Sequence, residues 1–513
     1  MADKNKYGQY FTINPIAEFM VSLISHPKES KVLEPSCGKG VFLENLFKYG
    51  FTNIDAYEID STLTTNFDYV KYQSFLSVPT TDKFDVVIGN PPYIRWKNLE
   101  AELKKELENN FLWNKYFNSL CDYLFIFILK SIEHLKDGGE LIFICTEYWL
   151  NTTHSVSLRN YMCLHGYFEE IYHFKETPLF EKVTASFIIF KFVKGTHNNR
   201  DITLYRYNKS RGLPTDDELK SKSCFTEVKI PAFKANSRWL LATQEKQNVL
   251  SAFEKACKKS HSNLFYDELN RLGDYCDIGN GMVSGLDTAF QIKDINNLNE
   301  AEQGKIIKVM KAKDLDVYKN ISDTCYIFIQ EDITPEEFKI KYPHFYTHFK
   351  PFRERLAERY SYNREIPYWE FVFPRNQKLF ERKEQKIFIP CKERISKKKY
   401  FRFCFAEAEY YSTQDVTAIF KKPDTRESLE YILAYLNSRI VFEWLGLNGI
   451  AKGDIVEFSE APIASIPFKS INWNSEEEVR LHDYITQNVK SYLMSQDNIY
   501  LNEIDNSLKT ILQ

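Results

Sequence analysis

The sequence predicts an α/β protein whose first part is built on a mostly parallel, doubly wound sheet, followed by a mixed α+β part. Two observations support this prediction. Across residues 1–195, short apolar runs alternate with segments of helical periodicity, which is typical of βαβ units. After about residue 200 the alternation fades, and strand-like, helix-like and aromatic segments mix without a visible internal repeat.

The elements of the first part can be assigned in chain order. We expect strands at 31–35, 53–60, 84–89, 140–145, 169–174 and 185–193, an ambiguous strand at 69–73, and helices at 40–50 and 121–135. Ligands of such sheets bind beyond the carboxyl ends of the strands. The glycines, acids and prolines that follow these strands are therefore the candidates for function.

Composition excludes several classes of protein. The chain has 513 residues, 43% of them hydrophobic, which predicts two or three globular domains. Its net charge is only -3, so binding to a nucleic acid would need a local basic surface. The ten cysteines form no CxxC pair or zinc-like cluster, so we expect no metal site. The sequence MADKNKYGQYFT contains no apolar signal segment, and we expect a cytoplasmic protein with no membrane partner.

A glycine-rich turn follows the first predicted strand. In EPSCGKG (34–40), Gly38 and Gly40 allow a tight turn and a close approach to a ligand, and a helix begins there. Glu58 ends the second strand roughly 20 residues later, a spacing at which an acid can accept hydrogen bonds from both ribose hydroxyls. The segment lacks the full dinucleotide pattern and the Gly-Lys-Ser/Thr of a P-loop. A nucleoside cofactor without a pyrophosphate therefore fits better than NAD.

The sequence NPPY follows the strand at 84–89. Pro91 and Pro92 lack an N–H and have a fixed φ, so the chain leaves the sheet stiffly while their carbonyls stay free to accept. The Asn90 side-chain oxygen and the Pro91 carbonyl can together accept both hydrogens of an exocyclic NH2 group. Tyr93 offers a flat face on which a ring can stack. The alternative is a strand-ending turn with a packing tyrosine.

Residues 1–195 resemble the catalytic domain of the S-adenosylmethionine-dependent DNA adenine N6-methyltransferases of the γ order, the TaqI-like group of type II restriction–modification systems. The motifs GQYFT, VLEPSCGKGVFLENL, AYEID and IGNPPY match this group in content and in order. The resemblance implies a Rossmann-like catalytic domain, S-adenosylmethionine as cofactor and double-stranded DNA as substrate. It also implies catalytic roles for Asn90, Pro91, Pro92 and Tyr93.

The resemblance further implies a set of cofactor-binding residues, namely Thr12, Glu34, Pro35, Gly38, Gly40, Glu58, Ile59, Ser74, Phe75 and Asn90. Ser74 departs from the family pattern, because an acid usually stands there and contacts the amino group of the cofactor adenine. A serine hydroxyl can accept the same hydrogen bond, but without charge. Phe180, in LFEKVTASFIIF, is expected to stack with Tyr93 on a flipped target base.

The second half is expected to recognise DNA. We predict a catalytic domain at 1–205, a connecting segment at 206–245 and a target-recognition domain at 246–513. Within the last, Leu433–Phe468 weakly resembles the C-terminal target-recognition domain of the same group. Arg375, Lys397, Lys398 and Lys399 lie in basic segments with interleaved aromatics and are candidate phosphate contacts. A solvated surface is the alternative explanation for these charges.

Three other functions stay open at this stage. The protein could methylate another planar amine, such as an RNA base or a protein glutamine, or it could be a fused nuclease–methylase. It could also be a catalytically weak DNA-binding defence subunit. The intact NPPY sequence and the large second half favour a DNA methyltransferase. We expect a monomer, and the resemblance implies that it protects host DNA from a cognate restriction endonuclease.

Overall fold

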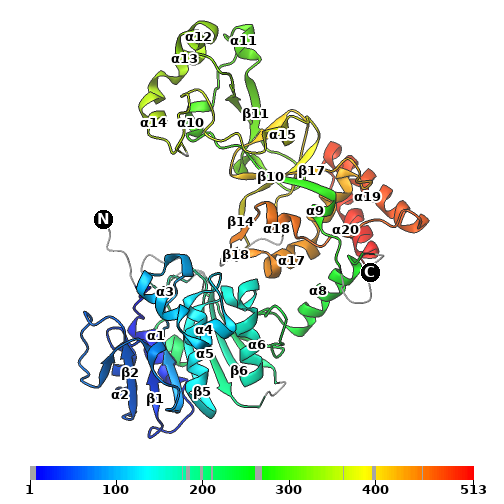
Figure 1. The fold of residues 1–513 in the computed structure, drawn as a ribbon. Coiled ribbons are helices and arrows are strands. Elements are labelled where there is room, and N and C mark those ends of the chain that lie inside the picture. Colours follow the sequence, from blue (N-terminus) through cyan, green and yellow to red (C-terminus); the bar gives the residue numbers. More distant parts are fainter. Residues whose placement is uncertain are drawn as a thin grey trace. The chain divides into compact units, whose positions relative to one another are not determined.

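The computed structural model describes residues 7–175, 177–180, 185–196, 200–209, 212–259, 268–361, 363–395, 400–452 and 455–512. The chain divides into two compact units, Met1–Gln247 and Asn248–Gln513 (Figure 1). In the described ranges, no helix is both long enough and apolar enough to cross a membrane.

A large sheet forms the centre of the first unit. Within the described residues its strands are β1 (Val32–Glu34), β2 (Ile54–Glu58), β3 (Val70–Tyr72), β4 (Phe84–Gly89), β5 (Leu135–Thr146), β6 (Gly166–Lys175), β7 (Phe187–Lys194), β8 (Ile202–Tyr207) and β9 (Phe225–Ile230). They lie in the order β3-β2-β1-β4-β5-β7-β6-β8-β9. Neighbours from β3 to β5 are parallel, whereas β7 is antiparallel to both β5 and β6. The predicted α/β class with a mostly parallel sheet is confirmed.

Both faces of this sheet are covered by helices, as the side-chain alternation of its strands requires. Val32 and Val86 belong to the apolar cluster on one face, and Leu33 and Val87 belong to the cluster on the other. The first cluster includes residues of α1 (Asn14–Ser22), α2 (Val41–Lys48) and α7 (Asp216–Lys220). The second includes residues of α3 (Ala101–Glu108), α4 (Phe111–Tyr116), α5 (Tyr123–His134) and α6 (Val156–His165). Short 3-10 turns lie at η1 (Phe75–Ser77), η2 (Trp96–Asn98), η3 (Tyr148–Leu150) and η4 (Thr153–Ser155).

The strand order reverses beside β1, and this reversal positions the site. From β1 the chain moves outward through β2 to β3, and it then returns to place β4 on the other side of β1. The connections after β1 and β4 therefore leave in opposite directions and open a crevice at the carboxyl ends of the two strands.

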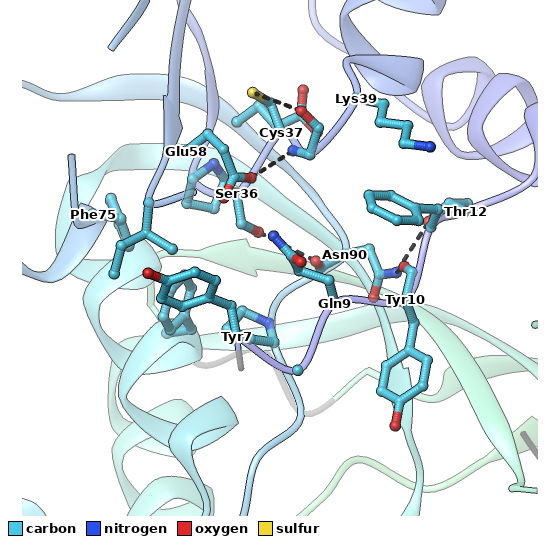
Figure 2. A pocket seen from close by; sticks show the side chains of 18 of the residues that line it. Tyr7, Gln9, Tyr10, Thr12, Ser36, Cys37, Lys39, Glu58, Phe75 and Asn90 are labelled. Carbon is cyan, nitrogen blue, oxygen red and sulfur yellow. Dashed lines mark hydrogen bonds between the residues drawn. The ribbon is translucent and has the colours of Figure 1, made fainter. Parts of the chain in front are cut away.

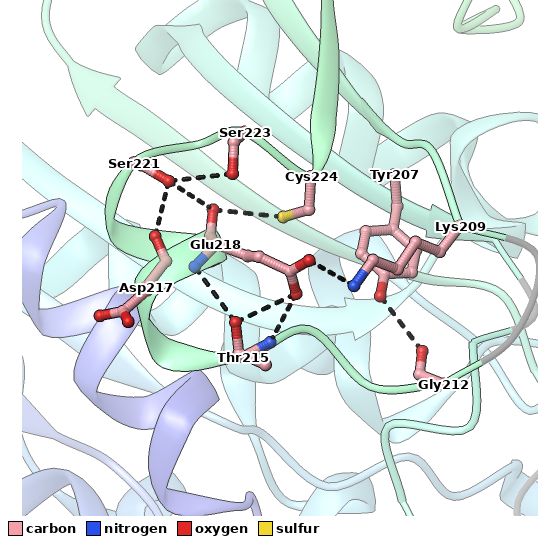
Figure 3. Close-up of polar contacts among 9 residues, drawn as sticks. All are labelled: Tyr207, Lys209, Gly212, Thr215, Asp217, Glu218, Ser221, Ser223 and Cys224. Carbon is pink, nitrogen blue, oxygen red and sulfur yellow. Dashed lines mark hydrogen bonds and ion pairs between the residues drawn. The ribbon is translucent and has the colours of Figure 1, made fainter.

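The segment 206–245, predicted to connect two domains, contains ordered elements of the first unit. Its strand β9 extends the sheet by pairing with β8, and its helix α7 begins at a capping box in which Thr215 and Glu218 bond reciprocally, at 3.3 and 2.9 Å (Figure 3). Lys209 forms an ion pair with Glu218, and the Tyr207 hydroxyl donates to the Gly212 carbonyl. These contacts tie the described parts of the β8–β9 connection to one another and to the end of β8.

The second unit mixes smaller sheets with helices, as predicted. Among its described residues the sheets are β10-β17-β13-β15, β12-β11-β16 and β14-β19-β18. Their strands are β10 (Cys276–Asn280), β11 (Ile306–Met310), β12 (Thr324–Ile327), β13 (Lys386–Pro390), β14 (Lys392–Arg394), β15 (Cys404–Ala406), β16 (Tyr410–Ser412), β17 (Val416–Lys421), β18 (Ile450–Lys452) and β19 (Ile455–Glu457).

The helices of the second half surround these sheets and supply two large apolar clusters. They are α8 (Gln244–Ala256), α9 (Leu272–Tyr275), α10 (Asp287–Phe290), α11 (Glu300–Gln303), α12 (Pro335–Lys341), α13 (Pro343–Phe349), α14 (Arg353–Ala357), α15 (Gln377–Phe380), α16 (Leu429–Leu436), α17 (Arg439–Asn448), α18 (Glu460–Ala464), α19 (Glu476–Ser495) and α20 (Ile499–Ile511), with 3-10 turns η5 (Ala312–Asp314) and η6 (Lys350–Phe352).

Candidate active site

A cavity of about 250 Å³ lies at the carboxyl ends of β1, β2 and β4, where the strand order reverses (Figure 2). All the predicted cofactor residues except Gly40 line it, namely Thr12, Glu34, Pro35, Gly38, Glu58, Ile59, Ser74, Phe75 and Asn90. Residues from five separate stretches of sequence therefore meet around one space, as the order of the motifs predicts. Gly40 lies just outside and is the residue before α2, with a φ of 86° that favours glycine.

Glu58 holds the glycine-rich turn in place. Its Oε2 accepts a hydrogen bond from the Gly38 amide at 2.8 Å, and its Oε1 accepts one from the Asp60 amide at 2.9 Å. Each carboxylate oxygen can accept further bonds, so the same group can bind two hydroxyls inside the cavity. Glu58 thus shapes the loop as well as offering acceptors to a ligand.

The cavity contains a second, buried carboxylate. Glu34 is fully buried, and among the described residues neither of its oxygens has a hydrogen-bond partner. Burial, and then the nearby Glu58 charge, raise the pKa of Glu34 well above its ordinary value. Burial likewise raises the pKa of Glu58, while the Asp60 and Gly38 amides oppose that rise. A site with two such acids favours a ligand that brings hydrogen-bond donors and positive charge.

One wall of the cavity is the N-terminal segment 7–12. Gly8 has a φ of 63° and packs so closely on Ile94 that an added Cβ would lie 2.3 Å from its Cγ1. The Gln9 side chain donates to Asp60 Oδ2 at 3.2 Å, which ties the segment to the loop after β2. Sequence reasoning named only Thr12 here, and it missed Tyr7, Gln9, Tyr10 and Phe11, which also line the cavity. Gln9, Tyr10 and Phe11 lie within the GQYFT motif itself, so the motif match was the available signal.

The Asn90 side chain is fixed in a single orientation. Its Nδ2 donates to the Tyr10 carbonyl at 2.6 Å and to Thr12 Oγ1 at 3.1 Å (Figure 2). Because the Tyr10 carbonyl can only accept, the amide nitrogen must face it, and Oδ1 faces the other way as an acceptor. The Ser36 hydroxyl also donates to the Asn90 carbonyl at 3.2 Å, which holds the start of the NPPY turn.

The remaining NPPY residues surround this amide. Pro92 lines the cavity and Pro91 is buried beside it. The Tyr93 hydroxyl lies within hydrogen-bond reach of Asn90 Oδ1 and of the Ile144 carbonyl. Tyr93 is therefore turned inward in this structure, because its hydroxyl finds one acceptor on Asn90, after β4, and another at Ile144, near the end of β5.

Phe180 lies in the same aromatic cluster as Tyr93. The Tyr10 ring stacks on Tyr93 at 6.0 Å, and Phe180 meets Tyr10 edge-on at 6.2 Å. Phe187, at the start of β7, contacts both Phe180 and Tyr93. Two of these four rings, those of Tyr10 and Phe187, were not singled out from the sequence.

The loop that carries Ser74 is supported from behind by α5. Ser74 Oγ accepts from the Leu76 amide at 3.2 Å and is also hydrogen-bonded to the Tyr123 hydroxyl, and Tyr123 lines the cavity. Buried Lys130 donates to the Leu76 carbonyl at 2.5 Å, and its burial lowers its pKa to about 8. A serine–tyrosine pair therefore occupies the position at which the resembling family usually has an acid.

The predicted DNA contacts fall elsewhere. Arg375 belongs to the second unit and lies beside the exposed ring of Phe373, with the guanidinium 5.5 Å from the ring centroid. Lys397, Lys398 and Lys399 lie outside the described residues. Throughout the described ranges, His, Cys, Asp and Glu side chains form no group that could hold a metal ion.

Comparison with known proteins identifies the class. Residues 36–180 match the model of the Eco57I restriction-modification methylase family. The type II methyltransferases M.HindII and M.HincII of Haemophilus influenzae are 43% and 41% identical, and each alignment covers 99% of this chain and 98% of the relative. The structure of the type IIL restriction-modification enzyme MmeI in complex with DNA shares the fold, with a TM-score of 0.57 at 11% identity over 97% of this chain and 72% of that one.

The sheet and the cavity at its strand ends are those of an S-adenosylmethionine-dependent methyltransferase. Because full-length relatives of more than 40% identity are type II methyltransferases, the chain belongs to the type II methyltransferase family of restriction–modification systems. Its cofactor is S-adenosylmethionine. The residues present fit this molecule. Glu58 can accept from ribose hydroxyls, and the Glu34 oxygens, which have no hydrogen-bond partner in the described part of the chain, can accept from a cationic group.

Proposed function

We propose that this protein transfers a methyl group from S-adenosylmethionine to the N6 amine of an adenine flipped out of duplex DNA. The observation that supports this proposal most directly is the fixed Asn90 amide. Its nitrogen is held by the Tyr10 carbonyl and Thr12, so its oxygen is a pre-oriented acceptor at the wall of the cofactor cavity. Such an acceptor suits a planar exocyclic amine.

The chemistry assigned to the NPPY turn follows from the electronic structure of adenine. The lone pair of the N6 amine is delocalised into the ring, so the amine is a poor nucleophile. Acceptance of its two hydrogens by Asn90 Oδ1 and the Pro91 carbonyl favours a pyramidal nitrogen and stabilises the positive charge that develops on it. The cofactor supplies the electrophilic methyl group. The role of the protein is to hold the amine in line with that methyl group, and this step needs no strong general base.

A base inside a duplex lies out of reach of the cavity, so the proposal requires base flipping. Tyr93 and Phe180 would provide stacking that offsets the lost base stacking by about 1–3 kcal/mol per base. In this structure the Tyr93 hydroxyl occupies the space between Asn90 Oδ1 and the Ile144 carbonyl. We infer that the target amine takes the place of this hydroxyl, and that Tyr93 turns outward to stack on the base.

Labelled methyl transfer tests this function. The protein is incubated with tritiated S-adenosylmethionine and duplex DNA, and the DNA is digested to nucleosides. Label in N6-methyladenine is the expected result. Label in N4-methylcytosine, or transfer to RNA or to a release-factor glutamine in place of DNA, would overturn the assignment.

We also propose that the protein acts as a monomer on a specific DNA sequence and protects it from a cognate restriction endonuclease. The relatives M.HindII and M.HincII, both named as type II methyltransferases, support this setting. Modification-sensitive sequencing of a genome that carries the gene gives the recognised sequence. Light scattering in the presence and absence of DNA gives the oligomeric state.

A further inference from the structure

Glu34 is an ionisable residue, and its contacts within the described part of the protein do not explain why a carboxyl group is buried at this position. It ends β1, lines the cavity and is fully buried, and within the described part of the chain neither carboxylate oxygen meets a donor. A carboxylate buried without partners destabilises a fold, because it loses its hydration and gains nothing in return. Gly89 lies beside Glu34, but neither its amide nor any other donor among the described residues bonds to the carboxylate.

Among the described residues, the titratable groups that interact with Glu34 come from several elements, and none of them is a cation. Glu58 faces it from the end of β2, Cys37 from the turn after β1, and Tyr69 from the residue before β3. Lys39 also lines the cavity, but its Nζ lies over the ring of Phe11, 4.7 Å from the centroid. The N-terminal segment adds only uncharged side chains, such as those of Tyr7 and Tyr10, to the opposite wall.

We propose that Glu34 gives up a proton when S-adenosylmethionine binds, and that this exchange makes the site prefer the cationic cofactor over the demethylated product. The two ligands share a carboxylate, an ammonium group, a ribose and an adenine. They differ by the methyl group and by the positive charge on sulfur. In the step we propose, the O–H bond of Glu34 breaks, the proton passes to solvent, and the resulting carboxylate balances the added positive charge.

Burial and the Glu58 charge raise the pKa of Glu34, which favours its protonated form before the cofactor arrives. After methyl transfer the sulfur is neutral, and the uncompensated carboxylate regains a proton. Product release is thereby favoured over cofactor release. The proposal rests on the cofactor alone, so it does not depend on which base is methylated.

Calorimetric titration of the full chain without DNA tests the proposal. Binding is measured in buffers of low and high ionisation enthalpy, which gives the number of protons released per ligand. We expect close to one proton for S-adenosylmethionine and clearly fewer for S-adenosylhomocysteine. Below the pKa of Glu34, the preference for the cofactor should rise about tenfold per pH unit. Sinefungin, which carries an amine at the position of the sulfonium, should behave like the cofactor.

Two variants separate charge from shape. Glu34→Gln should abolish the proton release and bring the two affinities to a pH-independent ratio. Ser74→Ala removes an uncharged group from the same cavity and should weaken both ligands equally while leaving the proton count unchanged. Equal proton release for cofactor and product in the unaltered protein would overturn the proposal, and this measurement decides the question even if the Glu34 variant does not fold.

Discussion

The orientation of a single amide decides what Asn90 can do. Because its nitrogen is engaged by the Tyr10 carbonyl and Thr12, its oxygen can act only as an acceptor on the other side. A rotated amide would present donors and would repel an amine. The neighbouring backbone therefore sets the chemistry of this side chain before any substrate arrives.

Asn90→Ala should slow methyl transfer far more than it weakens DNA binding. Loss of one oriented acceptor from a site of developing charge typically costs on the order of 10²–10³ in rate. Single-turnover methylation at saturating DNA measures the rate, and fluorescence anisotropy measures the binding. Full activity in this variant would mean that the NPPY sequence is only a strand-ending turn.

Glu58→Ala should weaken binding of S-adenosylmethionine by roughly 1.5–3 kcal/mol for each ribose hydrogen bond that is lost. The loss of its bonds to the Gly38 and Asp60 amides should add to this effect by loosening the turn. Asp55→Ala is a matched control, since Asp55 lies on the same strand and pairs with Lys31 and Lys71 outside the cavity. Calorimetry that gave equal affinities for the two variants would remove Glu58 from the site.

His134 makes stability depend on pH. It is fully buried at the end of α5 beside Phe75 and Phe84, and burial lowers its pKa to about 4. The folded state favours the neutral imidazole, so the contribution of His134 to the free energy of unfolding is fully present above about pH 6.5, the ordinary pKa of histidine. This contribution is lost as the pH falls through 4, the pKa in the folded state. The free energy of unfolding should fall by up to about 3 kcal/mol across this range.

His134→Asn should remove that pH dependence. The shorter amide can still donate toward the Asp82 carbonyl, which accepts from the imidazole Nδ1 at 3.1 Å, but it does not titrate. Urea unfolding at pH 7, 5.5 and 4 gives the slope for both proteins. Equal slopes would show that other groups cause the acid sensitivity.

At the scale of elements, the sequence predicted the core strands well and the connections less well. The run FDVVIG is a strand from Phe84 to Gly89 as expected, because its continuous apolar character suits a strand buried on both faces. The β8–β9 connection was predicted to be a loop because its polar residues dominate the composition. The Thr215–Glu218 capping box that begins α7 was nevertheless readable in the sequence.

The site was predictable to the extent that each residue belongs to a local motif. Glu58 and Asn90 follow apolar strands, so their place at the sheet edge follows from the strand assignments. Tyr10, Tyr123 and Lys130 could not be assigned in this way, because their roles arise from contacts between segments far apart in the sequence. The inward turn of Tyr93 depends on the Ile144 carbonyl and likewise needed the structure.

The N-terminal segment 7–12 depends on glycine at its start. Gly8→Ala would introduce a Cβ that meets Ile94 at 2.3 Å, at a φ that already disfavours alanine by roughly 1–2 kcal/mol. We expect the segment to shift and cofactor affinity to fall. Gly138→Ala is the control, since Gly138 also has a positive φ, of 80°, but nothing lies within 4 Å of its added Cβ. Equal cofactor affinity in the two variants would show that the segment tolerates a Cβ at position 8 and would contradict this prediction.

At the scale of the whole molecule, the division into two units predicts a division of labour. Every residue that lines the cavity belongs to the first unit. A fragment ending at Gln247 should bind S-adenosylmethionine with nearly the affinity of the full chain but should bind duplex DNA poorly, because the basic segments after Arg375 are missing. Calorimetry and a salt series of DNA binding measure the two properties. DNA binding at full strength would place recognition in the first unit instead.

The segment that bonds to Asn90 is also tied to Asp60 across the cofactor cavity. Cofactor and target base would therefore act on the same short stretch of backbone. If one ligand orders the segment 7–12, the other ligand no longer has to supply the free energy of ordering it. Such coupling between two ligands is reciprocal. The factor by which the cofactor tightens DNA binding must equal the factor by which DNA tightens cofactor binding. The enzyme would therefore search for its sequence most effectively when S-adenosylmethionine is already bound.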